Sequence, residues 1–244
     1  MNATIQAAQR AAAHKRGALV NLAGQMEAAD ARASDLWDAR KNHQAAAKLQ
    51  REEREVTAGH AFDLFPTPPD LAARMVAMCE DITPLFGGEA LWLEPSAGTG
   101  RIAQAIKDAG HTPNCIEIQY RAVELLKSRG FNVQQGDFLE MDPHNGITEP
   151  GRVTLPLRAD IIIMNPPFSK GQDIDHVLHA WSCLDLGGRI VAIMSEGVFY
   201  RKDKKAEAFR AFLDRSGGYS EKLPPGTFKS SGTGVNARLV ILDK

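Results

Sequence analysis

Residues 161–170 read IIIMNPPFSK and carry the strongest fold signal in the chain. The first four are apolar, which is typical of a strand buried on both faces of a parallel sheet. An asparagine, two prolines and a phenylalanine follow. Proline cannot donate a backbone hydrogen bond, and it biases the preceding residue towards extended conformations. The stretch therefore predicts a central strand that ends at Asn165, with the amide side chain held at its tip.

Outward from this strand, apolar stretches alternate with helical patterns that begin at proline or end at glycine. The predicted strands are residues 90–95, 112–118, 131–138, 159–165, 189–194, 219–224 and 237–243. The predicted helices are residues 66–82, 99–110, 120–130, 173–188 and 204–217. Such alternation predicts an α/β fold with a mostly parallel sheet of seven strands and helices on both faces. Ligands in such folds bind beyond the carboxyl ends of the strands.

The N-terminal segment differs in composition from the rest of the chain. Residues 3–56 are rich in Ala, Gln, Glu, Arg and Lys and contain no proline. This composition favours helix, and we expect two helices in a helical arm or hairpin. We therefore assign residues 1–60 to this arm and residues 61–244 to the α/β domain. The arm could pack on the main domain or on another subunit, or its basic side chains could contact DNA.

The bulk composition excludes several classes of protein. The apolar fraction of 43% and the charged fraction of 24% are those of an ordinary globular protein. No apolar run approaches the roughly 20 residues that span a bilayer, and the first residues lack a signal-peptide pattern. We expect a cytoplasmic protein without a membrane partner. The three cysteines are scattered and predict neither disulfides nor a metal site. A net charge of −1 is compatible with a local basic patch on the protein that binds nucleic acid.

Acidic residues follow three successive predicted strands. LEPSAGTG, residues 93–100, joins a glutamate to glycines that permit a tight turn. Glu94 would repel a pyrophosphate and suits a cationic ligand. Glu117, at the end of the next strand, can accept hydrogen bonds from both hydroxyls of a ribose. In GDF, residues 136–138, Asp137 can accept from an adenine amino group and Phe138 can pack on its ring. The set describes a pocket for an adenosine that bears no phosphate.

LEPSAGTG, Glu117, GDF and NPPF together resemble the motifs of the S-adenosylmethionine-dependent N6-adenine DNA methyltransferases, over roughly residues 62–242. FPTPPDLAARM, residues 65–75, resembles the segment that precedes the glycine loop in one subgroup. LPPGTFKSSGTGVNARLVIL, residues 223–242, resembles the closing hairpin. The resemblance implies a Rossmann-like methyltransferase fold and S-adenosyl-L-methionine as cofactor. It implies cofactor contacts from Thr67, Pro68, Glu94, Pro95, Ser96, Ala97, Gly98, Gly100, Glu117, Ile118, Asp137, Phe138 and Asn165.

The resemblance also gives the NPPF box a chemical role. The exocyclic amine of adenine is a poor nucleophile because its lone pair is delocalised into the ring. The Asn165 side-chain carbonyl and the Pro166 carbonyl can each accept one amine hydrogen, which favours the pyramidal transition state. Pro167 holds this geometry and Phe168 can stack on the base. Because a paired base cannot enter, the adenine must be flipped or unpaired. We expect Phe228, Lys229, Arg201 and Lys202 to help hold it and its backbone.

The sequence leaves the substrate and its recognition open. No target-recognition domain follows the closing hairpin, and the insert at residues 139–158 is short. Specificity could be relaxed, could come from a partner specificity subunit, or could involve the N-terminal helices, which could also support a homodimer. The same box occurs in enzymes that methylate adenine in RNA or a protein glutamine. A non-catalytic cofactor-binding subunit is the remaining alternative.

Overall fold

The computed structural model describes residues 35, 38–41, 43–44, 47–56, 65–143 and 157–244. The chain divides into two units, Met1–Glu52 and Glu53–Lys244. Every described residue before position 57 is helical, as the sequence predicts for this part. The remainder of the predicted helical pair, and the predicted boundary at residue 60, lie outside the described residues. The second unit holds the sheet and is described below.

A sheet of seven strands forms the centre of the second unit, in the order β3-β2-β1-β4-β5-β7-β6. The strands are β1 (Trp92–Glu94), β2 (Pro113–Glu117), β3 (Asn132–Gln135), β4 (Ala159–Met164), β5 (Leu184–Ser195), β6 (Tyr219–Lys222) and β7 (Ala237–Asp243). Strands β1 to β5 run parallel to one another. Strand β7 runs antiparallel to both β5 and β6. The sheet is therefore mixed, and the prediction of a mostly parallel sheet holds for its first five strands.

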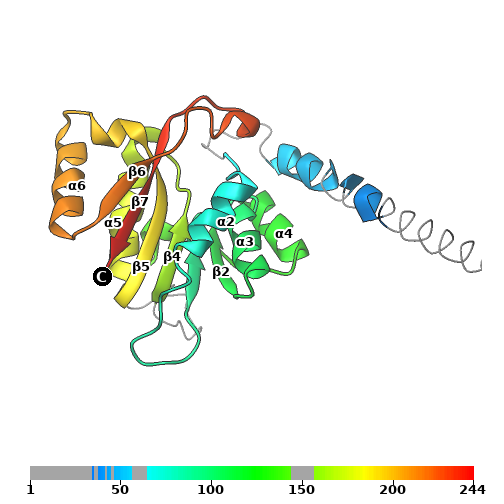
Figure 1. The fold of residues 1–244 in the computed structure, drawn as a ribbon, viewed down its shortest axis with the longest axis horizontal. Helices are drawn as coiled ribbons and strands as arrows, with labels where there is room; N and C mark the ends of the chain where they lie inside the picture. The colour runs from blue at the N-terminus through cyan, green and yellow to red at the C-terminus, as the bar shows by residue number, and fades with distance from the viewer. Residues whose placement is uncertain (1–34, 36–37, 42, 45–46, 57–64, 144–156) are drawn as a thin grey trace, which may run out of the picture. The chain divides into compact units, whose positions relative to one another are not determined.

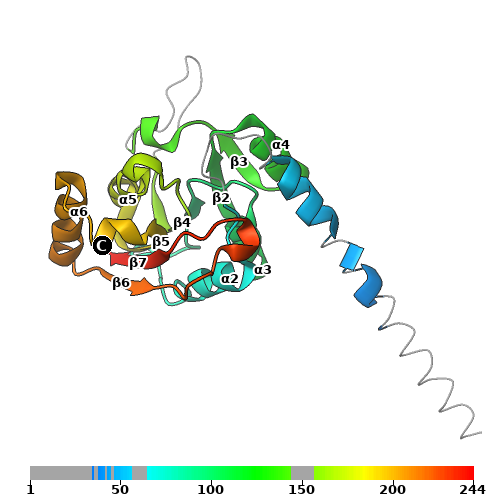
Figure 2. The same cartoon turned by 90° about the horizontal axis from the view of Figure 1, so that it is seen from above.

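Helices cover both faces of this sheet (Figures 1 and 2). They are α2 (Pro69–Ala77), α3 (Arg101–Asp108), α4 (Tyr120–Ser128), α5 (Gln172–Cys183) and α6 (Lys204–Arg215). Short 3-10 turns η1 (Phe138–Glu140), η2 (Ser169–Gly171), η3 (Glu196–Phe199) and η4 (Lys229–Ser231) connect them. Helices α2 and α3 lie on one side of the strands and α5 lies on the other (Figure 2).

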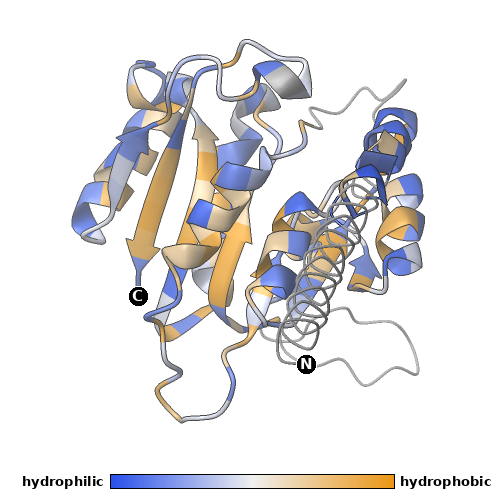
Figure 3. Cartoon of the chain, turned by 45° about the vertical axis from the view of Figure 1, so that its right-hand side comes forward, coloured by the Kyte–Doolittle hydropathy of each residue, from blue (hydrophilic) through white to orange (hydrophobic). Residues whose placement is uncertain are grey.

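Strand β4 shows why the central run is apolar throughout. Ile161 and Ile163 face the hydrophobic cluster that includes residues of α2 and α3. Ile162 and Met164 face the other cluster, which includes residues of α5 and α6. All four are fully buried, because successive side chains of a strand point to opposite faces and both faces are covered. Figure 3 shows the same hydrophobic character along the central strands.

Two predicted helices end earlier in the structure. The helix predicted over residues 66–82 ends at Ala77, as α2. The sequence predicts a helix over residues 173–188, but α5 ends at Cys183 and Leu184 already begins β5. Leu184 pairs with Ala159 of β4, and this pairing replaces the helical hydrogen bonds that the pattern alone favoured. Gly187, interpreted as part of a helix end, instead lies within the strand with a φ of 81°.

The cysteines behave as core residues. Cys79, Cys115 and Cys183 are free and buried. Burial raises the pKa of each thiol, which disfavours the reactive thiolate. No helix in the described part of the chain is long and apolar enough to cross a membrane.

Candidate active site

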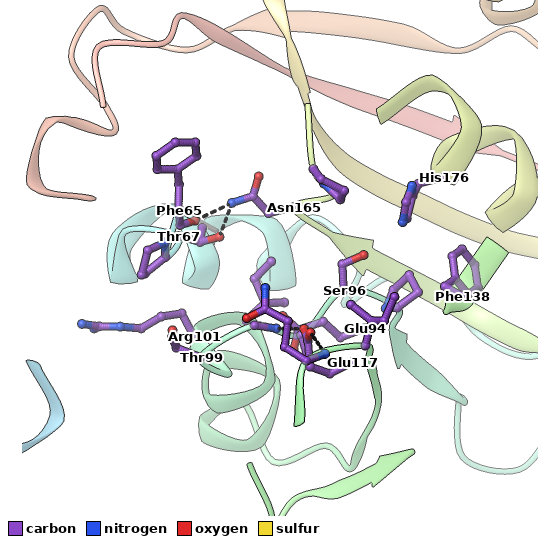
Figure 4. A pocket seen from close by; sticks show the side chains of 18 of the residues that line it. Phe65, Thr67, Glu94, Ser96, Thr99, Arg101, Glu117, Phe138, Asn165 and His176 are labelled. Carbon is purple, nitrogen blue, oxygen red and sulfur yellow. Dashed lines mark hydrogen bonds between the residues drawn. The ribbon is translucent and has the colours of Figure 1, made fainter. Parts of the chain in front are cut away.

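A pocket that is open to solvent lies where β1, β2 and β4 end at their carboxyl edge. Its lining comes from the segment before α2, from the loops after the strands and from α5 (Figure 4). The lining residues are Phe65, Pro66, Thr67, Glu94, Pro95, Ser96, Ala97, Gly98, Thr99, Arg101, Ile102, Glu117, Ile118, Gln119, Gly136, Asp137, Phe138, Asn165, Pro167, Gln172 and His176.

The loop after β1 is tied to β2 by backbone hydrogen bonds. The Ala97 N–H donates to the Ile116 carbonyl at 3.0 Å. Gly98 has a φ of 52°, in the left-handed region that favours glycine. Gly100 caps α3 with a φ of 79°, and a Cβ there would meet Leu126 Cδ2 at 2.6 Å. Gly98 therefore shapes the pocket wall, whereas Gly100 permits the close packing of α3 on α4.

Glu117 at the end of β2 is buried, at 5% exposure, and fixed by two backbone groups. One carboxylate oxygen accepts from the Gly98 N–H at 2.7 Å. The other accepts from the Gln119 N–H, also at 2.7 Å. Two carboxylate oxygens offer about four lone-pair sites, so the group can accept further hydrogen bonds from a ligand. The arrangement places this acceptor rigidly on the pocket wall.

Glu94 at the end of β1 is almost fully buried, at 1% exposure. Its Oε2 atom has no hydrogen-bond partner among the described residues. Burial raises the pKa of this carboxyl well above its usual value, and the nearby Glu117 raises the pKa further. A hydrogen bond from the Ala103 backbone opposes this shift. An orphaned buried acceptor of this kind fits a ligand that brings a cationic or hydrogen-bond-donating group.

Asp137 and Phe138 form the wall after β3. Asp137 caps η1, and its Oδ1 accepts from the Leu139 N–H at 2.9 Å. Phe138 is 2% exposed, and its ring meets the His179 ring edge-on with centroids 4.6 Å apart. The His176 ring also lies near Phe138, with ring centroids 5.9 Å apart. The carboxylate is therefore held beside an aromatic group whose packing is fixed by α5.

Asn165 stands at the tip of β4, where the sequence predicts it. Its Nδ2 atom donates to the Phe65 carbonyl at 3.0 Å and to Thr67 Oγ1 at 3.1 Å (Figure 4). Both amide hydrogens are therefore used within the protein, and the side-chain carbonyl remains as an acceptor. The segment before α2 thus sets the orientation of the amide. A simple strand-ending turn does not require this pair of contacts.

The residues after Asn165 differ in exposure. Pro166 is buried and Pro167 lines the pocket. Phe168 is half-buried and packs against the cluster under α2 and α3. Two consecutive left-handed residues follow, Lys170 with a φ of 57° and Gly171 with a φ of 72°. This turn leads directly from the NPPF box into α5.

The structure brings most predicted cofactor residues to the pocket, with two exceptions. Pro68 and Gly100 do not line it, because the first precedes α2 and the second caps α3. None of the predicted substrate residues lines it: Phe168, Phe228, Lys229, Arg201 and Lys202 all lie outside the lining. Phe228 is 2% exposed and packs in the same cluster as Leu223 and Ala237. The ring of Phe228 is therefore part of the core, and its contact with the base stays a prediction.

Arg201 and Lys205 lie beside the NPPF loop although they do not line the pocket. A Cβ placed on Gly171 would lie 3.4 Å from Arg201 Nη2 and 3.5 Å from Lys205 Nζ. Lys205 also pairs with Asp175 at 2.6 Å. The loop that follows the NPPF box is therefore flanked by two cations.

Sequence reasoning missed several residues that line the pocket: Phe65, Pro66, Thr99, Arg101, Ile102, Gln119, Gly136, Gln172 and His176. Most of these neighbour a predicted motif in the sequence. Gln172 and His176 are different, because they come from α5. Their spacing of four residues puts both on one face of that helix, and this spacing, directly after NPPF, was the available signal. No group of three or more His, Cys, Asp or Glu able to hold a metal ion occurs among the described residues.

Neither a protein-family model nor a curated protein matches the sequence. Solved structures do match. The methyltransferase subunit of a type I restriction-modification system from Streptococcus thermophilus superposes with a TM-score of 0.58 at 18% identity, covering 74% of this chain and 45% of that chain. The type IIG restriction endonuclease BpuSI gives a TM-score of 0.58 at 16% identity, covering 76% and 26%.

A third match, assigned to the class I S-adenosylmethionine-dependent methyltransferases of Listeria monocytogenes, gives a TM-score of 0.56 at 13% identity, covering 80% of this chain and 66% of that chain. The fold is that of the S-adenosylmethionine-dependent methyltransferases. The strand order reverses between β1 and β4. The pocket lies at the carboxyl ends of these two strands, which is where ligands bind in such sheets. The chain spans less than half of the length of the first two structures.

Proposed function

We propose that this protein transfers a methyl group from S-adenosyl-L-methionine to the exocyclic N6 amine of adenine in DNA. The observation that carries the proposal is the orientation of Asn165. Its amide hydrogens are bound by Phe65 and Thr67, and its carbonyl oxygen is thereby left as an acceptor at the pocket. An acceptor held in this way suits the hydrogens of a planar amine.

Three carboxylates support a cofactor with an adenosine and a cationic end. Glu117 and Asp137 offer acceptors for ribose hydroxyls and an adenine amine. Glu94 offers a buried oxygen without a partner among the described residues, which suits the cationic amino-acid end. Thr67 also faces the pocket and is placed to contact that end, whereas Pro68 would act by starting α2. When bound, the cofactor supplies an activated methyl group on a sulfonium.

The chain itself supplies alignment and hydrogen-bond acceptors. Asn165 Oδ1 would accept one hydrogen of the target amine, and the Pro166 carbonyl would accept the other. Two acceptors outside the plane of the base stabilise a pyramidal nitrogen more than a flat one, which favours the transition state over the ground state. Proline at 166 and 167 restricts the backbone that carries these acceptors. Most of the rate enhancement would therefore come from positioning.

The base would enter the pocket unpaired and stack on Phe168, which is half-buried and directly follows Pro167 of the pocket lining. Arg201 and Lys205 flank the loop that follows, where they could contact the phosphates of an extruded nucleotide. Lys202 and Lys229 are exposed and could add contacts farther along the backbone. The two restriction-system structures that share the fold support DNA as the nucleic acid. Both are longer than this chain, so a partner subunit or the N-terminal helices would supply or relax sequence specificity.

The decisive experiment offers the purified chain radiolabelled cofactor with duplex DNA, structured RNA and a protein extract. Digestion of the methylated product to nucleosides and mass spectrometry identify the modified base. N6-methyladenine in DNA is the expected result. Label only in RNA or in glutamine would assign the same chemistry to another substrate. Cofactor binding without any transfer, alone or with partner subunits, would favour a non-catalytic subunit and contradict the proposal.

A further inference from the structure

His176 is the one histidine that lines the pocket among the residues the structure describes. It lies on α5, and its side chain is buried, at 6% exposure. His176, Asp137 and Phe138 all line the pocket, and Figure 4 shows His176 beside Phe138. The motifs in the sequence give this histidine no role, although it stands where the adenine end of the cofactor would lie.

One hydrogen bond defines which ring nitrogen carries the proton. His176 Nδ1 lies 2.9 Å from the Gln172 carbonyl oxygen. A carbonyl can only accept, so Nδ1 is the donor and carries the hydrogen. Burial lowers the pKa of the imidazole, with His179 acting in the same direction and Asp137, Asp175 and the Gln172 carbonyl opposing it. In the neutral ring Nε2 therefore has a lone pair, and the described residues provide it with no donor.

This end of the pocket thus holds two acceptors. Asp137 uses Oδ1 for the Leu139 N–H and keeps Oδ2. His176 keeps Nε2. An adenine amino group has two hydrogens, and each acceptor can take one of them. A base with a carbonyl at the same position would face two acceptors and leave both without a partner, which is costly in a buried site.

We propose that His176 is a specificity-determining residue that accepts the second amino hydrogen of the cofactor's adenine, while Asp137 accepts the first. This inference rests on the proposed function, because it assumes an adenosine cofactor in this pocket. It predicts that the protein selects the 6-amino group against a 6-oxo group. The selectivity comes from two acceptors together, and α5 supplies one of them, His176.

The test uses S-adenosylhomocysteine and its hypoxanthine counterpart, S-inosylhomocysteine, with dissociation constants measured by calorimetry. The wild-type protein is expected to prefer the adenine compound by at least about 100-fold, as sites that bind a donor group reject analogues lacking it. His176→Phe is expected to weaken binding of the adenine compound by about 5- to 20-fold, the scale of one lost hydrogen bond in a buried site. Binding of the hypoxanthine compound should stay the same or improve, so that the selectivity falls.

His179→Phe is the matched control, because it makes the same change on the same helix. His179 also packs on Phe138 but does not line the pocket. Its selectivity should equal that of the wild-type protein, and thermal melts check that both variants fold. Unchanged selectivity in a folded His176→Phe variant would overturn the role of His176 and leave the proposed function intact. Failure of the wild-type protein to bind either compound would overturn both.

Discussion

Asn165 and Thr67 are 98 residues apart in the sequence and are joined by a hydrogen bond of 3.1 Å from Nδ2 to Oγ1. Thr67 is 4% exposed, so its hydroxyl has little access to water. The contact links the segment before α2 to the tip of β4. It fixes which side of the amide is an acceptor, and the proposed chemistry depends on that choice.

Replacing Thr67 tests this link. Thr67→Val keeps the shape of the side chain and removes the hydroxyl. Loss of one neutral hydrogen bond costs about 0.5–1.5 kcal/mol, so we expect kcat to fall by about 2- to 13-fold. Thr67→Ser keeps the hydroxyl and should retain activity close to that of the wild-type protein. Steady-state kinetics with saturating cofactor provide the measurement, and equal kcat values for all three proteins would refute the orienting role.

Asn165 itself should be needed for transfer but hardly for cofactor binding. Asn165→Ala removes the side-chain acceptor and is expected to abolish methylation. Its dissociation constant for sinefungin should stay within a few-fold of the wild-type value, because Glu94, Glu117 and Asp137 remain. Methylation assays and calorimetry on the same preparation separate the two effects. Surviving activity would show that the amide does not activate the amine.

Glu117 should contribute strongly to cofactor affinity. Glu117→Ala removes a carboxylate that is held by the Gly98 and Gln119 N–H groups. We expect binding to weaken by about 1.5–3 kcal/mol, the usual scale for a hydrogen bond to a charged group. Gln134→Ala, an exposed change on the neighbouring strand β3, serves as the control. A dissociation constant that does not change in Glu117→Ala would rule out the ribose contact.

Replacing Glu94 by glutamine should raise the stability of the ligand-free protein and weaken its binding of sinefungin. Burial raises the pKa of its carboxyl, so folding favours the protonated form. The protonated carboxyl makes its full contribution to stability below the pKa of the unfolded state, about 4.3. This contribution is lost as the pH rises through the higher pKa of the folded state. Glu94→Gln stays neutral, so its gain in Tm over the ligand-free wild-type protein should grow with pH.

The same variant should bind sinefungin more weakly, because it lacks the negative charge that faces the ligand's ammonium groups. Thermal melts across a pH series and calorimetry at one pH measure the two effects. A difference in Tm that does not depend on pH would mean that Glu94 does not titrate as its burial implies.

Arg201 and Lys205 should contribute charge to nucleic-acid binding. Both flank Gly171 next to the NPPF loop. Each phosphate contact contributes about 0.9 to the slope of log K against log salt, so the Arg201→Ala, Lys205→Ala double variant should lower that slope by about 2. Lys127→Ala on α4 is the control, since this exposed lysine pairs locally with Glu124. An unchanged slope in the double variant would place the nucleic acid elsewhere.

Much of this protein follows from local patterns. The apolar run at 161–164 predicts a strand buried on both faces, and β4 is such a strand. Glycine positions and strand spacing place Glu94, Glu117, Asp137 and Asn165 at carboxyl ends of strands, and the pocket gathers all four. These predictions succeed because strand period, turn chemistry and parallel topology are set by neighbouring residues.

Several side-chain placements depend on tertiary structure and do not follow from local patterns. The elements and the acidic residues at the strand ends follow from the sequence, because short-range sterics and hydrophobic period control them. Packing decided that the ring of Phe228 is buried in the core, that Thr67 orients Asn165, and that His176 lines the same pocket as Asp137. Each of these depends on segments far apart in the chain meeting at one edge of the sheet, and no local propensity encodes which side chains meet there.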